Sequence, residues 1–243
     1  MPFTETDTVG QIVRNNPAAV GVFETLGIDF CCGGKRSLGE ACERVNKPVE
    51  QVIADLEASL QLPPIREDCH WLTCSLTELA DHIVSRHHEY VRRQLPVLLS
   101  LAARVANRHG ATRPEVIELG SLLDAVDSEL SPHLLKEEAV LFPAFRQMEL
   151  TGEGATRRAC FPALINPIRH MMEDHDDAGE LLRRIRAITN QYALPADACM
   201  TYQALYRGLK EFEEDLHRHI HLENNILFPR ALEFEKSHRE KVA

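Results

Sequence analysis

The stretch "HLLKEEAVLFP", from His133 to Pro143, decides the fold of this chain, because it recurs as "HIHLENNILFP" from His219 to Pro229. Both copies read His-x-x-x-Glu-x-x-x-Leu-Phe-Pro. In each copy the histidine and the glutamate are four residues apart, which places them one above the other on the same face of an α-helix. The apolar residues around each pair continue in steps of three or four. The pattern therefore predicts a histidine and a glutamate at core positions of two different helices.

Two other apolar stripes of helical spacing are also interrupted by a histidine. His88 and His175 each stand where the stripe calls for an apolar residue. His133 follows His88 by 45 positions, and His219 follows His175 by 44. Such regular spacing predicts two copies of one helical hairpin. Each copy contributes a histidine from its first helix and a His-x-x-x-Glu pair from its second.

Helical periodicity dominates the whole chain, and we find no convincing strand alternation or hairpin turn. The predicted fold class is all-α: a four-helix up-down bundle preceded by a small helical N-terminal domain. Two consecutive prolines followed by charged residues interrupt the helical pattern after Leu62. We therefore expect a small domain with a Cys-Cys turn at 1–62, a linker at 63–74 and the bundle at 75–243. The prolines inside the long helical patterns predict kinks or early ends at Pro96, Pro132, Pro143 and Pro229.

Composition and charge exclude several classes of function. Lys plus Arg number 27 against 37 for Asp plus Glu, which leaves a net charge of −10. This balance argues against nucleic acid or an anionic membrane as a partner, because both require a basic surface. No apolar run approaches the roughly 20 residues that span a bilayer, and the N-terminus has no leader pattern. With seven cysteines in no disulfide framework, we expect a cytoplasmic protein with reduced thiols.

Folding the two hairpins face to face would gather four imidazoles and two carboxylates at one level of the core. Burying six ionisable groups together without a metal would cost several kcal/mol for each unpaired charge. Nitrogen and oxygen ligands for two ions favour iron, with manganese second. If both glutamates bridge, each ion keeps two imidazoles and two carboxylate oxygens, with positions left for an oxo or hydroxo bridge and a small diatomic molecule. The predicted metal ligands are His88, His133, Glu137, His175, His219 and Glu223.

Further polar residues near these positions have two readings. Glu129 precedes His133 by four residues, so we expect it to share the inward face, as a neighbour of the ligands or a proton relay; otherwise it is a solvated helix carboxylate. Glu138 and Asp174 are expected to point outward. The other histidines fall off the stripes or near helix ends, and we expect them to be solvated: His70, His82, His87, His109, His170, His217, His221 and His238.

The stretch "DFCCGGK" places Cys31 and Cys32 on a glycine-rich turn near the start of a helix that Ser37 caps. We expect this turn to be exposed and the helix N-terminus to lower the pKa of the thiols. A redox or iron-transfer role follows from that reading. Adjacent cysteines can also be no more than small turn residues, and the sequence does not choose among iron delivery, a redox relay and docking to a partner.

The chain resembles the iron-sulfur cluster repair di-iron proteins, also called repair-of-iron-centres proteins, a hemerythrin-like family. The resemblance implies that the six residues above hold two non-haem iron ions. His87, directly before the first of the six ligands, stands where an aromatic residue is expected, and the apolar stripe selects His88 as the ligand. The resembling segments are "LGIDFCCGGKRSL", "HIVSRHHEYVRRQLP", "HLLKEEAVLFP", "MMEDHDDAGELL" and "HIHLENNILFPRA".

The same resemblance implies a function. The family is associated with restoring iron-sulfur clusters after nitrosative or oxidative damage, and with binding or reducing nitric oxide at the di-iron centre. Damaged iron-sulfur proteins are then the expected partners, and nitric oxide or oxygen the small ligand. The alternatives are a sensor or scavenger of nitric oxide or oxygen without turnover and, less favoured, an iron store. The sequence leaves open whether the chain is a nitric oxide reductase, which electron donor it uses and whether it forms a homo-oligomer.

Overall fold

A computed structural model describes residues 3–60, 71–152 and 163–242. Every named element in these residues is a helix, and the all-α prediction of a helical bundle with a small helical N-terminal region is confirmed. Most of the expected linker, with Cys69 and His70, lies outside the described residues, as does Cys160. The chain divides into two compact units, Met1–Ala80 with Ala144–Ile168 and Arg218–Ala243, and Asp81–Pro143 with Arg169–His217. The division expected from the sequence, at 62 and 75, stays a prediction.

Four short helices form the N-terminal region, and local sequence signals explain their ends. The Thr8 side chain caps the first helix by accepting from the backbone of Gln11. Gly27 ends the second with φ of 72°, in the left-handed region where glycine carries no steric penalty. Ser37 caps the third in a reciprocal capping box with Glu40. The helices are α1 (Val9–Asn15), α2 (Ala19–Leu26), α3 (Leu38–Arg44) and α4 (Val49–Ser59).

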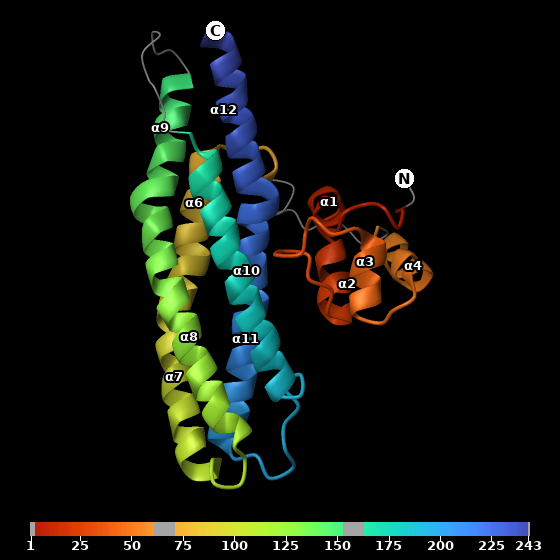
Figure 1. The fold of residues 1–243 in the computed structure, drawn as a ribbon, viewed down its shortest axis with the longest axis vertical. Coiled ribbons are helices and arrows are strands. Elements are labelled where there is room, and N and C mark those ends of the chain that lie inside the picture. Colours follow the sequence, from red (N-terminus) through yellow and green to blue (C-terminus); the bar gives the residue numbers. More distant parts are fainter. Residues whose placement is uncertain (1–2, 61–70, 153–162, 243) are drawn as a thin grey trace. The chain divides into compact units, whose positions relative to one another are not determined.

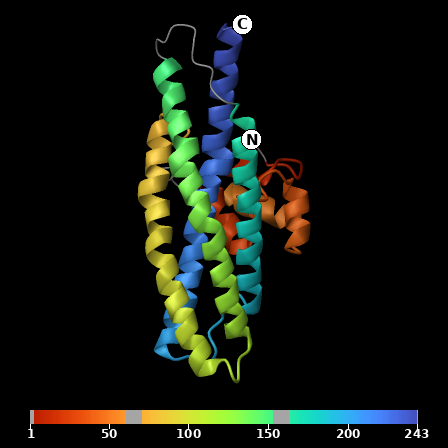
Figure 2. The same ribbon diagram turned by 60° about the vertical axis from the view of Figure 1, so that its left-hand side comes forward.

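Long helical segments make up the bundle (Figures 1 and 2). Three of them contain one widened π-helical turn each, so that α6, η1 and α7 follow one another without a break, as do α8, η2 and α9, and α11, η3 and α12. The elements are α6 (Leu76–Ile83), η1 (Val84–His88), α7 (Glu89–His109), α8 (Glu115–Lys136), η2 (Glu137–Leu141), α9 (Phe142–Gly152), α10 (Ile165–Ile188), α11 (Met200–His221), η3 (Leu222–Leu227) and α12 (Phe228–Val242).

The prolines of the two Leu-Phe-Pro sequences lie inside α9 and α12, and Pro96 and Pro132 lie inside α7 and α8, so of the kinks or early ends expected there the early ends are wrong. Each Leu-Phe-Pro proline lies one residue after a π-helical turn closes. The backbone N–H of Phe142 bonds to the carbonyl of Glu137, and that of Phe228 bonds to Glu223, in both cases five residues back. Proline lacks an N–H and its ring crowds the carbonyl four residues earlier. A widened turn just before it lets the helix continue.

Within the first unit the Cys-Cys turn contacts η3. The side-chain amide of Asn224 donates to the carbonyl of Cys31 at 3.3 Å, and that of Asn225 donates to the carbonyl of Phe30 at 3.1 Å. Within the N-terminal region the backbone N–H of Gly10 donates to the carbonyl of Gly34 at 2.9 Å. Asn224 and Asn225 thus join the N-terminal region to the π-helical turn that carries Glu223.

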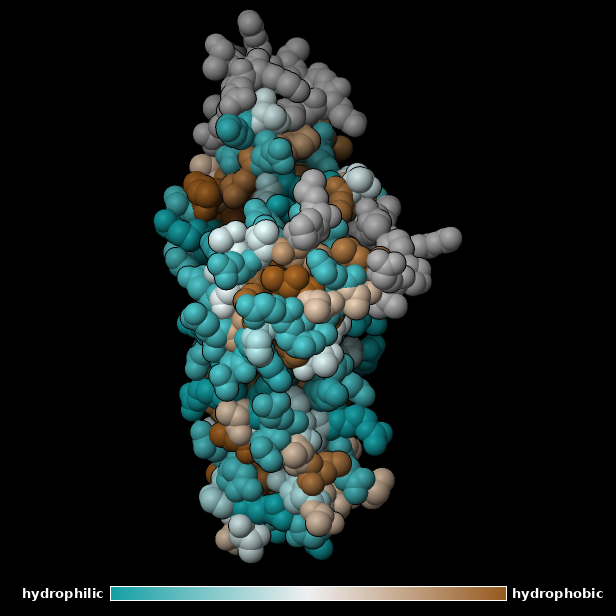
Figure 3. All heavy atoms as spheres, turned by 90° about the vertical axis from the view of Figure 1, so that its right-hand side faces the viewer, coloured by the Kyte–Doolittle hydropathy of each residue, from teal (hydrophilic) through white to brown (hydrophobic). Residues whose placement is uncertain are grey.

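The face seen in Figure 3 is mostly hydrophilic, with hydrophobic residues scattered over it. Among the described helices, none combines the length and the apolar character that crossing a membrane requires.

Candidate metal centre

All six predicted ligand residues lie at or beside the π-helical turns or on α10. His88 is the last residue of η1, Glu137 the first of η2, and Glu223 the second of η3. π-Helical turns are rare and are found mostly at functional sites, because the extra residue re-aims side chains that a regular helix would rotate away. His133 and His219 precede their glutamates by one turn on α8 and α11, and His175 lies within α10.

These six side chains are almost completely buried. The most exposed of them, His133, retains 2% of its surface, and both glutamates retain none. Charged side chains are almost never fully buried unless they are paired or bind a metal. Two glutamates inside an otherwise apolar core therefore require positive charge close by.

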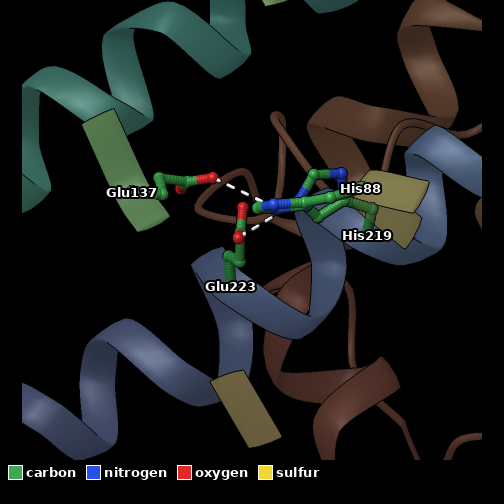
Figure 4. Close-up of side chains that lie close together, drawn as sticks. All are labelled: His88, Glu137, His219 and Glu223. Carbon is green, nitrogen blue, oxygen red and sulfur yellow. Dashed lines mark ion pairs between the residues drawn. The ribbon is translucent and has the colours of Figure 1, made fainter. Parts of the chain in front are cut away.

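The donor atoms form two groups that share both carboxylates. One group is His88, Glu137, His219 and Glu223, and the other is His133, Glu137, His175 and Glu223; within each group the donor atoms lie within 4.8 Å of one another. Figure 4 shows the first group, with Glu137 directed toward His88 and Glu223 toward His219. Each group thus has two imidazoles and the same two carboxylates. Two such groups side by side are the arrangement of a two-metal site.

Glu137 lies between two imidazoles. Its Oε2 atom is 3.4 Å from Nε2 of His88, and its Oε1 atom is 3.4 Å from Nε2 of His133. Nε2 of His219 is 3.1 Å from Oε1 of Glu223, and Nε2 of His175 is 3.1 Å from Nε2 of His133. Every imidazole thus presents the same ring nitrogen to the centre.

The other ring nitrogens of His88 and His133 contact carboxylates. Nδ1 of His88 is 2.6 Å from Oε1 of Glu138, and Nδ1 of His133 is 3.1 Å from Oδ2 of Asp174. An ionised carboxylate only accepts, so each Nδ1 carries a proton, and in the neutral imidazole Nε2 is then the nitrogen that offers a lone pair to a metal. In both rings Nε2 faces an oxygen of Glu137, so a nitrogen donor and a carboxylate donor point at the same place. The residues present therefore fit a bound metal.

This arrangement corrects the expectation that Glu138 and Asp174 point outward. Both are half-buried and hold ligand-candidate imidazoles. Burial would raise the pKa of Glu138, but hydrogen bonds from His88 and Arg92 hold it below its usual value. Asp174 behaves alike: hydrogen bonds from His133 and Lys136 outweigh its burial and lower its pKa. Both carboxylates are therefore ionised at neutral pH.

Three other residues differ from their expected environments. Glu129 is exposed, so its expected inward orientation is wrong; its pKa is raised by partial burial and by the charges of Asp177 and Asp174. His87 is buried rather than solvated, with Nδ1 3.1 Å from Oδ2 of Asp215. His221 is buried as well, and Nδ1 of its ring lies 2.9 Å from the side-chain amide of Asn225.

The Cys-Cys turn is organised by Asp29. Oδ1 of this residue accepts from the backbone N–H groups of Cys32 and Gly33, both at 3.0 Å, and lies 3.4 Å from Sγ of Cys31. The two sulfur atoms are 3.8 Å apart and form no disulfide. Cys31 is buried, contrary to expectation, and its pKa is raised well above the usual value by the hydrogen bond with Cys32 and by burial. The two thiols and Asp29 form a third group of possible metal ligands.

The fold and these two groups of donors define a hemerythrin-like cation-binding protein. The Hemerythrin HHE cation binding domain matches residues 79–231, and a Domain of Unknown function (DUF542) matches residues 5–60. The chain belongs to the family of iron-sulfur cluster repair proteins named YtfE. It is 41% identical to the YtfE protein of Citrobacter koseri over 225 residues, which are 92% of this chain and 96% of that relative. The corresponding proteins of Escherichia coli O17:K52:H18 and of an Enterobacter species are 40% identical with the same coverage.

Proposed function

We propose that the six buried residues hold two iron ions. The observation that carries this proposal is the sharing of both carboxylates, because Glu137 and Glu223 belong to each of the two donor groups. One ion would take His88 and His219, and the other His133 and His175. Imidazole and carboxylate donors suit iron better than zinc, whose structural sites favour thiolates, or magnesium, which favours oxygen alone.

The iron ions, when bound, supply electron transfer and a place for a small diatomic molecule. The contributions of the protein itself follow from the contacts described above. Glu138 and Asp174 fix the orientation of two imidazoles and keep the proton on Nδ1, so that Nε2 remains available. The ring of Phe142 stacks on His88, with centroids 5.8 Å apart. Burial of all six residues excludes bulk water, which strengthens every electrostatic interaction at the centre.

We propose further that the chain acts in the cytoplasm on iron-sulfur proteins whose clusters nitrosative or oxidative stress has damaged. This is supported by the printed name of its relatives, iron-sulfur cluster repair protein, across 92% of the chain. Nitric oxide or oxygen would be the small ligand of the iron centre. The thiols of Cys31 and Cys32, joined to η3 through Asn224, are candidates for a redox or iron-transfer step.

The metal proposal is tested on protein produced with iron-57. Mössbauer spectroscopy should show an antiferromagnetically coupled pair in the wild type, and His133→Ala or His219→Ala should lose it. His170→Ala is the matched control, since His170 is exposed and pairs with Glu173 on the surface of α10. Full retention of iron and of its spectrum in both ligand variants would place the metal elsewhere.

The repair proposal needs a separate assay. An iron-sulfur enzyme inactivated by nitric oxide should regain activity when the iron-loaded chain is added, and the His133→Ala variant should not restore it. Reduced protein mixed anaerobically with excess nitric oxide shows whether nitrous oxide is released over several turnovers or the gas is only bound. Iron binding without restored enzyme activity would support the metal centre and reject the repair function.

A further inference from the structure

A cysteine and a histidine meet in the second unit, at helix ends remote from the metal centre. Sγ of Cys199 lies 3.6 Å from Nε2 of His109. His109 is the last residue of α7, and His88 directly precedes that helix. At 1.5 Å of rise per residue the two histidines are roughly 30 Å apart along the helix. The pair is therefore independent of the iron centre proposed above.

The backbone at the start of α11 favours a thiolate at Cys199. The carbonyl of Cys199 accepts from the backbone N–H of Gln203 at 3.0 Å, which makes Cys199 the N-cap of the 22-residue helix α11. Its thiol is thus at the positive end of a helix, where a thiolate is stabilised. His109 is in the last turn of α7, so its imidazole meets this thiol where the end of α7 and the start of α11 come together.

Neighbouring groups hold the imidazole in place. The ring of His109 packs against that of Tyr202, with centroids 5.5 Å apart. The guanidinium of Arg113 lies over the Tyr202 ring, 6.0 Å from its centroid, and is paired with Asp197. A nucleophile next to a base that a third group orients is the arrangement of an activated thiol.

Cys199 differs from the other thiols in its surroundings. It is partly exposed, whereas Cys31, Cys42 and Cys74 are buried. Burial raises the pKa of Cys42 and Cys74. The pKa of Cys199 is lowered to about 7, first by the hydrogen bond with His109 and then by the backbone N–H groups that begin α11.

We propose that Cys199 and His109 form a reactive thiolate–imidazole pair that low-molecular-weight disulfides modify reversibly. The Cys199 thiolate attacks one sulfur atom of the small disulfide, a new disulfide bond forms to Sγ, and the original sulfur–sulfur bond breaks. The departing thiolate takes a proton from water. The small disulfide is the only oxidant consumed, and a small thiol reverses the step.

The experiment treats the full-length protein anaerobically with glutathione disulfide and maps the adducts cysteine by cysteine by mass spectrometry. Cys199 should be modified first, and faster than Cys32, the other partly exposed thiol in the described residues. The rate at Cys199 should rise with pH with a midpoint near 7. In His109→Gln the rate at pH 7 should fall by about three- to tenfold, because a smaller thiolate fraction is partly offset by higher intrinsic nucleophilicity.

Cys199→Ser should abolish this adduct and leave the iron content unchanged, which separates the thiol pair from the metal centre. Circular dichroism checks that His109→Gln is folded. Where it is not, the pH profile of Cys199 in the wild type decides, since an ordinary thiol would titrate near 8.5. Slower modification of Cys199 than of Cys32, or a midpoint near 8.5, would overturn the proposal.

Discussion

Oε1 of Glu138 lies 2.6 Å from Nδ1 of His88 and 2.6 Å from Nη2 of Arg92. One carboxylate oxygen thus joins an exposed arginine to a fully buried imidazole. The arginine and the histidine belong to one helical segment, and Glu138 belongs to the next. This contact fixes the His88 ring from outside the centre and determines which of its nitrogens faces Glu137.

Replacing Glu138 with Gln should weaken iron binding. The variant keeps the shape of the side chain but loses the charge that holds the proton on Nδ1, and changes of this kind lower metal affinity by about 10- to 100-fold. Competition with a chelator measures the affinity, and Mössbauer parameters report the altered site. Glu180→Gln is the control, because Glu180 is exposed and pairs with Arg183. Equal iron affinity in the two variants would show that Glu138 does not position His88.

The two repeated sequences, together with the stripes that His88 and His175 interrupt, were enough to predict long helices and to select the six residues that meet in the core. Glu138 and Asp174 could not be found in the same way. Each is next to a core position on its own helix, where periodicity indicates an outward direction, yet each contacts a histidine of a neighbouring segment. Such contacts depend on how helices pack together, which the spacing within one helix does not report.

The π-helical turns are a second reason why helical periodicity does not predict the direction of every side chain. A regular helix turns by about 100° for each residue, so one extra residue in a turn rotates everything after it by that amount. The turn Leu222–Leu227 carries the side chains that hold the Cys-Cys segment, and its widening is not encoded in the 3.6-residue period. The sequence also does not reveal the burial of Cys31. A glycine-rich turn is expected to be exposed unless another segment contacts it, as Asn224 of η3 does here.

Gly10→Ala should destabilise the junction between α1 and η3. A Cβ atom at Gly10 would lie 2.5 Å from Oδ1 of Asn225 and 2.9 Å from the carbonyl of Gly34, closer than real Cβ contacts. A Cβ atom at Gly21 of α2 would have nothing within 4 Å. Gly21→Ala should therefore raise stability by about 0.5–1 kcal/mol through its better helix propensity. Urea unfolding compares the two variants. A Gly10→Ala protein more stable than the wild type would contradict the close packing of Gly10 against Asn225 and Gly34.

The capping box of α3 predicts a pH-dependent contribution to stability. The pKa of Glu40 is lowered by hydrogen bonds from the backbone and side chain of Ser37. A lowered pKa in the folded state means that the contribution is present above the unfolded value and is lost as pH falls through the folded value. The Tm difference between wild type and Glu40→Ala should accordingly be largest near neutral pH and should disappear in acid. For Glu43→Ala, at an exposed position of the same helix, the Tm difference from wild type should show no such pH dependence.

The turn after α10 contains backbone strain that a buried ion pair offsets. Asn190, Gln191 and Tyr192 have φ of 48°, 58° and 61°, three successive residues in the left-handed region that side chains disfavour. The hydroxyl of Tyr192 donates to Oε2 of Glu213 at 2.9 Å. Nη2 of Arg186 donates to the same oxygen at 2.7 Å. Glu213 retains 2% of its surface, so its charge depends on these two partners.

Glu213→Gln should lower the free energy of unfolding by about 2 kcal/mol, less than the loss of a fully buried pair because Arg186 is partly exposed. Tyr192→Phe removes one hydrogen bond and should cost about 1 kcal/mol. Chemical denaturation followed by circular dichroism measures both, and limited proteolysis should cut the released turn in Glu213→Gln. Glu214→Gln, in an exposed pair with Lys210, should stay within about 0.5 kcal/mol of the wild type. If Glu213→Gln is as stable as Glu214→Gln, the ion pair does not hold the strained turn.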